Sequence, residues 1–136
     1  MIVADTNIIA HLFLPSDHTS FAEELLQIDS SWAAPMLWRS ELRNVLMLYL
    51  RRGLLSFEQA YATQSEAEQL MGVNEFEVDS LDVLSIANSG TISAYDAEFV
   101  ALARHLDVPL VTLDKKVLNE LPETASSPEI FMRRPT

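Results

Sequence analysis

The sequence contains no cysteine, and its 136 residues include only 3 histidines. Without cysteine the chain forms no disulfide, holds no zinc ion through thiolates and offers no cysteine nucleophile. The three histidines, His11, His18 and His105, are scattered and lack the spacing of metal ligands. Any bound metal ion is therefore expected to have oxygen ligands, which Mg²⁺ and Mn²⁺ prefer.

Basic residues are also few, because 9 lysines and arginines stand against 20 acidic residues and give a formal net charge of −11. This balance argues against a protein that binds duplex nucleic acid through a broad basic face. No apolar run approaches the roughly 18 residues of a membrane span, and the start MIVADTNII has no basic segment before its apolar stretch. We expect a cytoplasmic protein that binds any polyanion locally.

The length and the 49% hydrophobic content correspond to a single domain, residues 1–136, with enough apolar side chains for a core. The pattern alternates strand with helix and indicates an α/β fold. Strands are predicted at residues 1–4, 31–34, 76–78, 108–113 and, at a sheet edge, 129–132. Helices are predicted at residues 6–14, from 19 or 20 to 28, and at 35–53, 56–72, 80–88, 94–106 and 115–121. A polar tail follows at 123–129. Ser56 with Gln59 matches a capping box, and Asp79 and Ser93 are placed as helix caps.

Two aspartates follow predicted strands. Asp5 comes directly after MIVA at residues 1–4, and Asp114 closes the run VPLVTL at 108–113. In an open parallel sheet the carboxyl ends of the strands are where ligands bind, so we expect these two side chains to converge. Aspartate after a strand also caps the helix that follows, and both residues are placed to do so. The two roles are compatible.

A third carboxylate, Glu41, lies in the second turn of the predicted helix 35–53, with apolar residues three and four positions away. A carboxylate within or beside an apolar face needs a partner. The partner is a metal ion, Arg39, Arg43 or a backbone amide, and we favour the metal ion.

The local sequence explains three further acids as structural. Asp96 lies in the first turn of the predicted helix 94–106, where the helix dipole favours a carboxylate. Asp79 and Asp82 are the cap and the first-turn acid of the predicted helix 80–88. None of these positions indicates a ligand by itself.

Six basic side chains lie near these acids in the sequence. Arg43, on the helix of Glu41, and Lys115, beside Asp114, are the preferred candidates for contact with a phosphate group. The others are Arg39, Arg51, Arg52 and Lys116. Solvated surface charge is the alternative for each of them.

Three segments together resemble one protein family. They are DTNIIAHLF from residue 5, RSELRNVL from residue 39, and SAYDAEFVALARHLDVPLVTLDKKVL from residue 93. The chain resembles the PIN domain family, and in particular the VapC-type ribonuclease toxins of prokaryotic toxin–antitoxin pairs. The resemblance covers nearly the whole chain, is weakest between residues 54 and 90, and is most specific from Tyr95 to Asp114.

The resemblance implies a set of site residues. The acidic quartet of the family corresponds to Asp5, Glu41, Asp96 and Asp114. Asp96 thereby becomes a metal ligand, which its local sequence does not indicate. The polar residue two positions after the first aspartate corresponds to Asn7, and the threonine of the TxD element to Thr112. Both are implied to hold the carboxylates or to position a phosphate.

The resemblance further implies a three-layer α/β/α sandwich with a central, mainly parallel sheet. It implies a pocket for Mg²⁺ or Mn²⁺ at the carboxyl edge of the sheet and hydrolysis of RNA phosphodiester bonds there. The implied partners are RNA, an antitoxin protein whose basic segment enters the acidic pocket, and a second copy of the chain. Some apolar residues of helix 35–52 exceed one helical face and suit either an interface or the core: Trp38, Leu46, Met47 and Leu50.

Three alternatives remain at this point. A PIN-like ribonuclease for RNA processing would lack an antitoxin reading frame beside it. A phosphotransfer domain of the response-regulator type also uses strand-end aspartates and Mg²⁺, but it needs paired acids after the first strand and a phosphoacceptor in mid-chain, which this sequence does not offer clearly. A binding module that has lost its chemistry is disfavoured by the complete quartet, and metal titration tests it.

Overall fold

The structure, a computed structural model, describes residues 1–134 and contains a five-stranded sheet in which every pairing is parallel. The strand order is β3–β2–β1–β4–β5. The strands are β1 (Ile2–Ala4), β2 (Trp32–Pro35), β3 (Glu75–Phe76), β4 (Leu110–Val111) and β5 (Ala125–Ser126). The prediction of an α/β fold with a mainly parallel sheet is confirmed.

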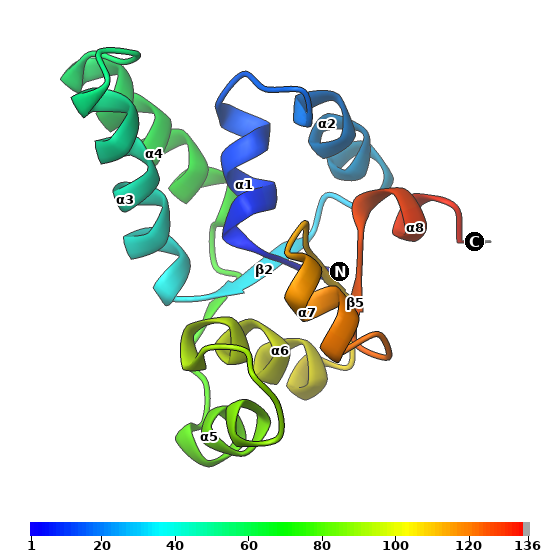
Figure 1. The fold of residues 1–136 in the computed structure, drawn as a ribbon. Helices are drawn as coiled ribbons and strands as arrows, with labels where there is room; N and C mark the ends of the chain where they lie inside the picture. The colour runs from blue at the N-terminus through cyan, green and yellow to red at the C-terminus, as the bar shows by residue number, and fades with distance from the viewer. Residues whose placement is uncertain (135–136) are drawn as a thin grey trace.

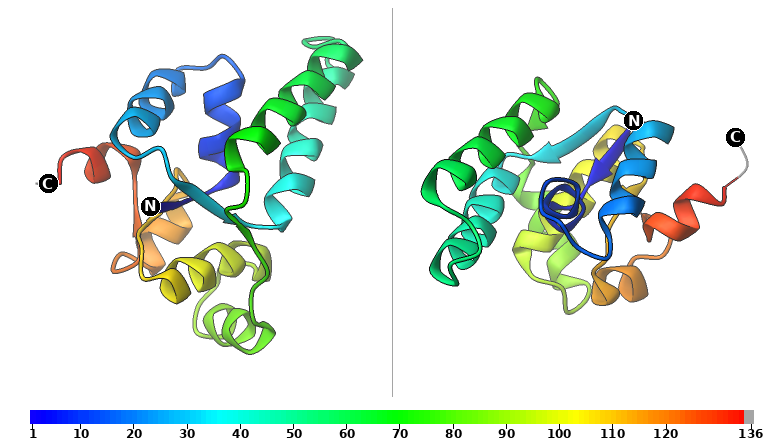
Figure 2. Two further views of the ribbon diagram at one scale, coloured as in Figure 1. Left: turned by 180° about the vertical axis from the view of Figure 1, so that it is seen from behind. Right: turned by 90° about the horizontal axis from the view of Figure 1, so that it is seen from above.

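Helices cover both faces of this sheet. Helices α1 to α4 lie on one side, and α5 and α6 lie on the other (Figures 1 and 2). Their bounds are α1 (Thr6–Phe13), α2 (Thr19–Ile28), α3 (Leu37–Arg51), α4 (Phe57–Met71), α5 (Ser80–Asn88), α6 (Ala94–Leu106), α7 (Lys115–Glu120) and α8 (Pro128–Met132). Helix α6 packs directly against β1, β2 and β4. Among residues 1–134 no helix has both the length and the apolar character needed to cross a membrane.

The central strand β1 fixes where the strand ends meet. Ile2, Val3 and Ala4 are all fully buried, as expected for a parallel strand with helices on both faces. Val3 pairs with Leu110 and Ala4 pairs with Val111, so β1 and β4 run in register to the same edge of the sheet. The residues that follow the two strands therefore leave the sheet side by side.

The predicted helix caps are present. Ser56 accepts from the backbone of Gln59 while the Gln59 side chain accepts from the backbone of Ser56, which completes the capping box of α4. Asp79 accepts from the backbone of Asp82 and begins α5. Ser93 does the same for α6. Local polar side chains thus define the starts of three helices.

The predicted edge strand at residues 129–132 is wrong, because this segment belongs to helix α8. Ser127 caps the helix and Pro128 occupies its first turn, where a missing N–H costs nothing. The edge strand is β5, which lies in the segment 123–129 that the sequence indicates as a polar tail. The serine and proline before the apolar residues mark a helix start rather than a strand.

Several other boundaries also differ from the prediction. Pro35 ends β2 instead of opening a helix, and α3 begins at Leu37. Within the predicted strand 108–113 only Leu110–Val111 has strand structure. Val108 and Pro109 connect α6 to this strand, and Thr112 and Leu113 lead into the helix that follows.

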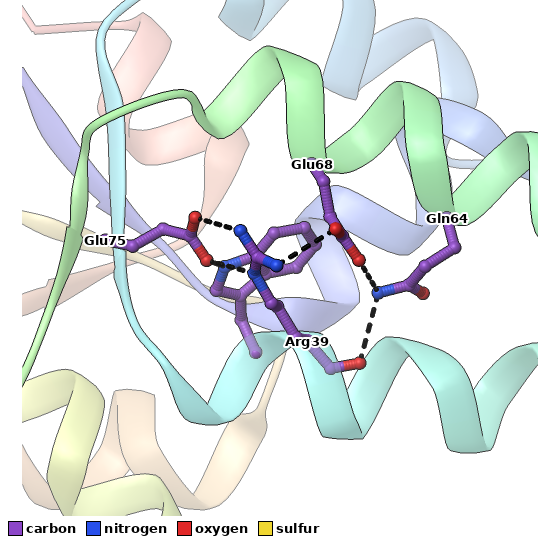
Figure 3. Close-up of polar contacts among 5 residues, drawn as sticks. Arg39, Gln64, Glu68 and Glu75 are labelled. Carbon is purple, nitrogen blue, oxygen red and sulfur yellow. Dashed lines mark hydrogen bonds and ion pairs between the residues drawn. The ribbon is translucent and has the colours of Figure 1, made fainter.

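Arg39 on α3 lies at the centre of a polar network that joins α3, α4 and β3 (Figure 3). Its guanidinium group donates to both carboxylate oxygens of Glu75 at 2.6 Å and to Glu68 at 3.0 Å. Gln64 donates to Glu68 and to the Arg39 carbonyl oxygen, and Trp38 donates to Glu75. We call these five residues the arginine network. They exclude the interpretation of Arg39 as the partner of Glu41.

Candidate metal centre

Asp5 lies at the carboxyl end of β1 and is only 8% exposed. Its Oδ1 accepts a hydrogen bond of 2.7 Å from the backbone N–H of Thr6, which makes Asp5 the cap of α1 as predicted. Its Oδ2 accepts from the Thr112 hydroxyl at 2.7 Å and from the Asn7 amide at 3.5 Å. The side chain is thus fixed from the neighbouring strand and from the following helix.

Thr112 connects the ends of the two strands. It is fully buried, and its single hydroxyl proton is donated to Asp5. The same oxygen accepts from the Asn7 amide at 3.4 Å and from the Asp114 backbone N–H at 3.0 Å. Asn7 also accepts from the Leu113 backbone at 3.3 Å. The structure therefore brings Asn7 and Thr112 together with Asp5, and it aligns the chain that leads to Asp114.

Asp114 caps helix α7, as its position after a strand predicted. Its Oδ1 accepts from the backbone N–H groups of Lys116 and Val117 at 2.9 and 3.2 Å. Within residues 1–134 its Oδ2 makes no hydrogen bond. One oxygen thus begins a helix and the other remains available to a ligand.

Glu41 is half-buried on α3 and faces the start of α1. Its Oε1 accepts a hydrogen bond of 2.7 Å from the Thr6 hydroxyl, which comes from a residue 35 positions earlier in the chain. Thr6 also donates its backbone N–H to Asp5. Glu41 and Asp5 are therefore held by the same residue.

The charges of neighbouring carboxylates act on three of these groups. Burial raises the pKa of Asp5 from 3.8 to about 7, against the effect of hydrogen bonds from Thr112 and Thr6, and the charges of Asp96 and Glu41 raise it further. Burial is likewise the main cause that raises the pKa of Glu41, and the charge of Asp96 adds to it. We call the quartet of Asp5, Glu41, Asp96 and Asp114 the acidic pocket.

Asp96 is the residue through which Asp114 is linked electrostatically to Asp5 and Glu41. Burial is the largest cause that raises the pKa of Asp96, and the nearby charge of Asp114 is the second. The hydrogen bond from Ser93 and the charge of Lys116 oppose this change. The charge of Asp114 thus raises the pKa of Asp96, and the charge of Asp96 raises the pKa values of Asp5 and Glu41.

The acidic pocket has the donor chemistry of a site for a hard cation. None of the ion pairs among the described residues includes any of its four carboxylates. Carboxylate, hydroxyl and amide oxygens are the ligands that Mg²⁺ and Mn²⁺ prefer. Within the described part of the chain, however, no three acidic or histidine side chains are arranged to hold one metal ion. The residues therefore fit an ion bound through one or two carboxylates and water, which is the usual mode for Mg²⁺.

The two predicted phosphate contacts lie outside this hydrogen-bonded centre. Arg43 and Lys115 are exposed, and neither side chain makes a hydrogen bond or ion pair among residues 1–134. The lysine whose charge reaches the pocket is Lys116, which lowers the pKa of Asp96. Both predicted residues remain free to meet a ligand at the surface.

Sequence reasoning missed two residues that act on the pocket. Thr6 donates to Glu41, and the charge of Glu98 raises the pKa of Glu41. Both effects depend on packing between elements distant in sequence, so no local pattern indicates them. Glu98 lies two positions after Asp96 on α6, and only the folded structure reveals its effect on Glu41.

Comparison with known proteins identifies the family to which this fold belongs. The family model described as the PIN domain matches residues 2–123. The chain belongs to the PIN domain family. The match leaves out only Met1 and the residues after Glu123, so the whole acidic pocket lies within the PIN domain.

Individual relatives extend over nearly the whole chain. Ribonuclease VapC3 of Pyrobaculum aerophilum is 27% identical over 124 residues, which are 89% of this chain and 95% of that protein. A crystal structure of a Pyrobaculum aerophilum protein has a TM-score of 0.75 at 21% identity and covers 97% of this chain and 96% of its own. A toxin–antitoxin complex from Klebsiella pneumoniae has a TM-score of 0.70 at 16% identity and covers 94% of this chain and 98% of its own. These two structures show that this PIN fold is shared at low identity.

Proposed function

We propose that this PIN domain is a divalent-metal-dependent endoribonuclease and the toxin of a VapBC-type toxin–antitoxin pair. The observation that carries the proposal is the acidic pocket, in which a carboxylate that is 8% exposed is surrounded by like charges without a basic partner among the described residues. The similarity to a ribonuclease over 95% of that protein's length supports the choice of RNA as the substrate.

The four carboxylates have distinct positions in this proposal. Asp5, Asp96 and Asp114 would hold Mg²⁺ or Mn²⁺, directly or through its water molecules, and Glu41 would hold the ion or orient a water molecule. When bound, the ion supplies positive charge for the phosphoryl oxygens and lowers the pKa of a bound water. The Oδ2 atom of Asp114, which has no hydrogen bond among residues 1–134, suits a ligand role.

Thr112 and Asn7 would act by orienting Asp5. Their hydrogen bonds to Asp5 Oδ2 fix the carboxylate in one rotamer, and partners of this kind tune the affinity of a metal ligand. The exposed side chains of Arg43 and Lys115 would contact phosphate groups of the RNA on either side of the cleaved bond. With a net charge of −11 the chain needs such local contacts, because the protein as a whole repels RNA.

The decisive experiment is cleavage of a pool of single-stranded and structured RNA by purified protein. The reaction is run with Mg²⁺, with Mn²⁺ and with EDTA, and Asp96→Asn is tested alongside. Cleavage that requires the metal ion and is lost in the variant supports the proposal. Cleavage that persists in EDTA contradicts the metal dependence, and cleavage that persists in Asp96→Asn contradicts the site.

The proposed protein partner is an antitoxin with a basic segment that enters the acidic pocket. The toxin–antitoxin complex among the similar structures supports this partner, and the excess of acidic residues complements a basic segment.

Expression of the chain in a bacterial host is expected to arrest growth, whereas expression of Asp96→Asn is not. Growth restored by the product of a neighbouring reading frame would support the pair. A chain that cuts RNA without arresting growth would instead fit an RNA-processing nuclease. The cytoplasm is the compartment in which we expect either activity.

We also propose a homodimer. The α5 residues Leu81 and Leu84 are 73% and 62% exposed, and Leu84 lines a hollow of about 450 Å³ together with Met36 and Val83. An apolar surface of this kind on an acidic protein suits contact with a second copy, which excludes water from it. Light scattering is expected to give twice the monomer mass, and Leu84→Glu is expected to give the monomer.

A further inference from the structure

Thr6 contacts two carboxylates of the acidic pocket from the first position of α1. Its backbone N–H donates to Asp5 Oδ1 and its hydroxyl donates to Glu41 Oε1, both at 2.7 Å. Thr6 is only 6% exposed. One buried residue thus connects the end of β1 with the second turn of α3.

The position of Thr6 at the start of its helix leaves its hydroxyl proton available. Within a helix, a threonine hydroxyl commonly donates to the carbonyl group of the preceding turn, as Thr63 does to Gln59 in α4 at 2.8 Å. Thr6 has no preceding helical turn, so its single proton goes to Glu41 instead. The branched Cβ also restricts the side-chain rotamer, which keeps the hydroxyl directed at Glu41.

Loss of this hydrogen bond would favour conformations in which the Glu41 side chain leaves the acidic pocket. It is half-buried and lies near the negative charges of Asp96 and Glu98. Among the described residues, the Thr6 hydroxyl is the one hydrogen-bond donor to the Glu41 side chain. A half-buried carboxylate without a donor is destabilised and turns towards water when the helix allows it.

We propose that Thr6 is a positioning residue whose hydroxyl holds the Glu41 carboxylate in the acidic pocket, ready to act on the metal ion or its water. This inference rests on the proposed function and adds a residue to its site. The competing explanation is that Thr6 only fills space beside the core. The two explanations differ in which part of the side chain matters, the hydroxyl or the methyl group.

Two substitutions separate the hydroxyl from the methyl group. Thr6→Val keeps the branched shape and removes the donor, whereas Thr6→Ser keeps the donor and removes the methyl group. We expect Thr6→Val to lower kcat for RNA cleavage by on the order of tenfold to a hundredfold, the equivalent of one hydrogen bond to a charged group, with little change in KM. Thr6→Val should also weaken Mn²⁺ binding measured by calorimetry without RNA. Thr6→Ser should retain most of both, and Thr63→Val is the matched control on α4.

Several outcomes overturn the inference. Wild-type cleavage and Mn²⁺ affinity in Thr6→Val would do so, and so would an equal loss in Thr6→Ser, because a packing role predicts that the methyl group matters. If Thr6→Val does not fold, Thr6→Ala compared with Thr6→Ser isolates the hydroxyl in the same way. If the wild-type protein binds Mn²⁺ but cuts no RNA, the proposed function fails, and the Mn²⁺ affinities of the variants still decide the role of Thr6. A wild-type protein that does neither overturns both.

Discussion

Helix α3 contributes to two clusters of carboxylates that differ in whether a basic side chain of the described protein pairs with the acids. In the arginine network, Arg39 binds both oxygens of Glu75 and one oxygen of Glu68 (Figure 3). In the acidic pocket, Glu41 lies only two residues further along α3, near Asp96 and Asp5, and forms no ion pair with a basic residue within 1–134. Residues two apart on a helix do not face each other, so the cation of one cluster does not serve the other.

The pKa values of the carboxyl groups follow this difference. Hydrogen bonds from Arg39 lower the pKa of Glu75, so its negative charge is stabilised within the protein. Burial and like charges raise the pKa values of Asp5, Glu41 and Asp96. A cluster that contains its own cationic side chain, such as the arginine network, holds secondary-structure elements together. A cluster whose acids form no ion pair among the described residues is suited to a cation from solution. Strongly perturbed carboxyl groups of this kind are common at functional sites.

The largest expected effect separates the two clusters by activity. Asp5→Asn or Asp96→Asn should abolish RNA cleavage and Mn²⁺ binding, because each removes a negative ligand from the acidic pocket. Glu68→Gln makes the same kind of change in the arginine network and should retain cleavage, since Glu68 contacts Arg39 and Gln64 instead. The measurement is the rate of RNA cleavage by folded proteins. Equal losses in the two clusters would remove the distinction between them.

The pH dependence of stability gives the second effect. The pKa of Asp5 is about 7 in the folded protein and 3.8 is its ordinary value, so the folded state keeps a proton that the unfolded state has lost. Stability from this group is therefore fully present below pH 3.8 and is lost as pH rises through about 7. At about 1.4 kcal/mol per pKa unit the loss is on the order of 4 kcal/mol in metal-free protein.

Asp5→Asn should remove much of this slope, because asparagine does not titrate. Urea denaturation in EDTA at several pH values measures the free energy of unfolding, and the variant should be more stable than the wild type near neutral pH. Glu41 and Asp96 have raised pKa values as well, so a smaller slope of the same sign should remain. A wild-type slope in Asp5→Asn would show that Asp5 is not the group responsible.

The arginine network should respond to loss of its cation with a smaller change. Arg39→Met leaves Glu75, whose side chain is 8% exposed, without its charged partner and should lower the free energy of unfolding by about 1.5 to 3 kcal/mol. The loss should shrink at low pH, because Glu75 has a lowered pKa and its contribution disappears as it takes up a proton. Arg43→Met, at an exposed position on the same helix, is the control. Equal stability of the two variants would contradict the structural role of Arg39.

The smallest effect concerns acids that belong to neither cluster. Asp79 caps α5, and Asp82 lies in its first turn. Asp79→Ala and Asp82→Ala should each lower the free energy of unfolding by about 0.5 to 2 kcal/mol. Both variants should keep RNA cleavage. Thermal unfolding and the cleavage assay measure the two quantities. Loss of cleavage in a folded Asp82→Ala protein would show that the acidic pocket extends to α5.

The sequence was sufficient where structure depends on neighbouring residues. Capping side chains at Ser56, Asp79 and Ser93 begin their helices as predicted, because a cap acts within three residues of itself. The two strand-end acids Asp5 and Asp114 also lie as predicted, since buried apolar runs define parallel strands. The strand predicted at 129–132 is wrong because Ser127 and Pro128 begin a helix there. The strand β5 was missed because it has only two residues and offers no periodicity to recognise.

The sequence was insufficient where side chains meet across the fold. The pairing of Arg39 with Glu75 joins positions 36 residues apart, and nothing near Arg39 in the sequence indicates that it turns away from Glu41. Thr6 meets Glu41 over a similar separation. Asp96 needed a family resemblance to be considered a ligand, because a first-turn aspartate is an ordinary helix feature. Packing of α3, α6 and α1 around the strand ends creates the site.

Thermal unfolding with increasing Mn²⁺ tests most directly whether the acidic pocket needs a cation from solution. A ligand that binds the folded state raises its stability in proportion to the logarithm of its concentration above the dissociation constant. The melting temperature of the wild-type protein should rise with Mn²⁺, that of Glu68→Gln should rise equally, and that of Asp96→Asn should stay constant. A wild-type melting temperature that does not respond, or an equal response in Asp96→Asn, would contradict the metal centre.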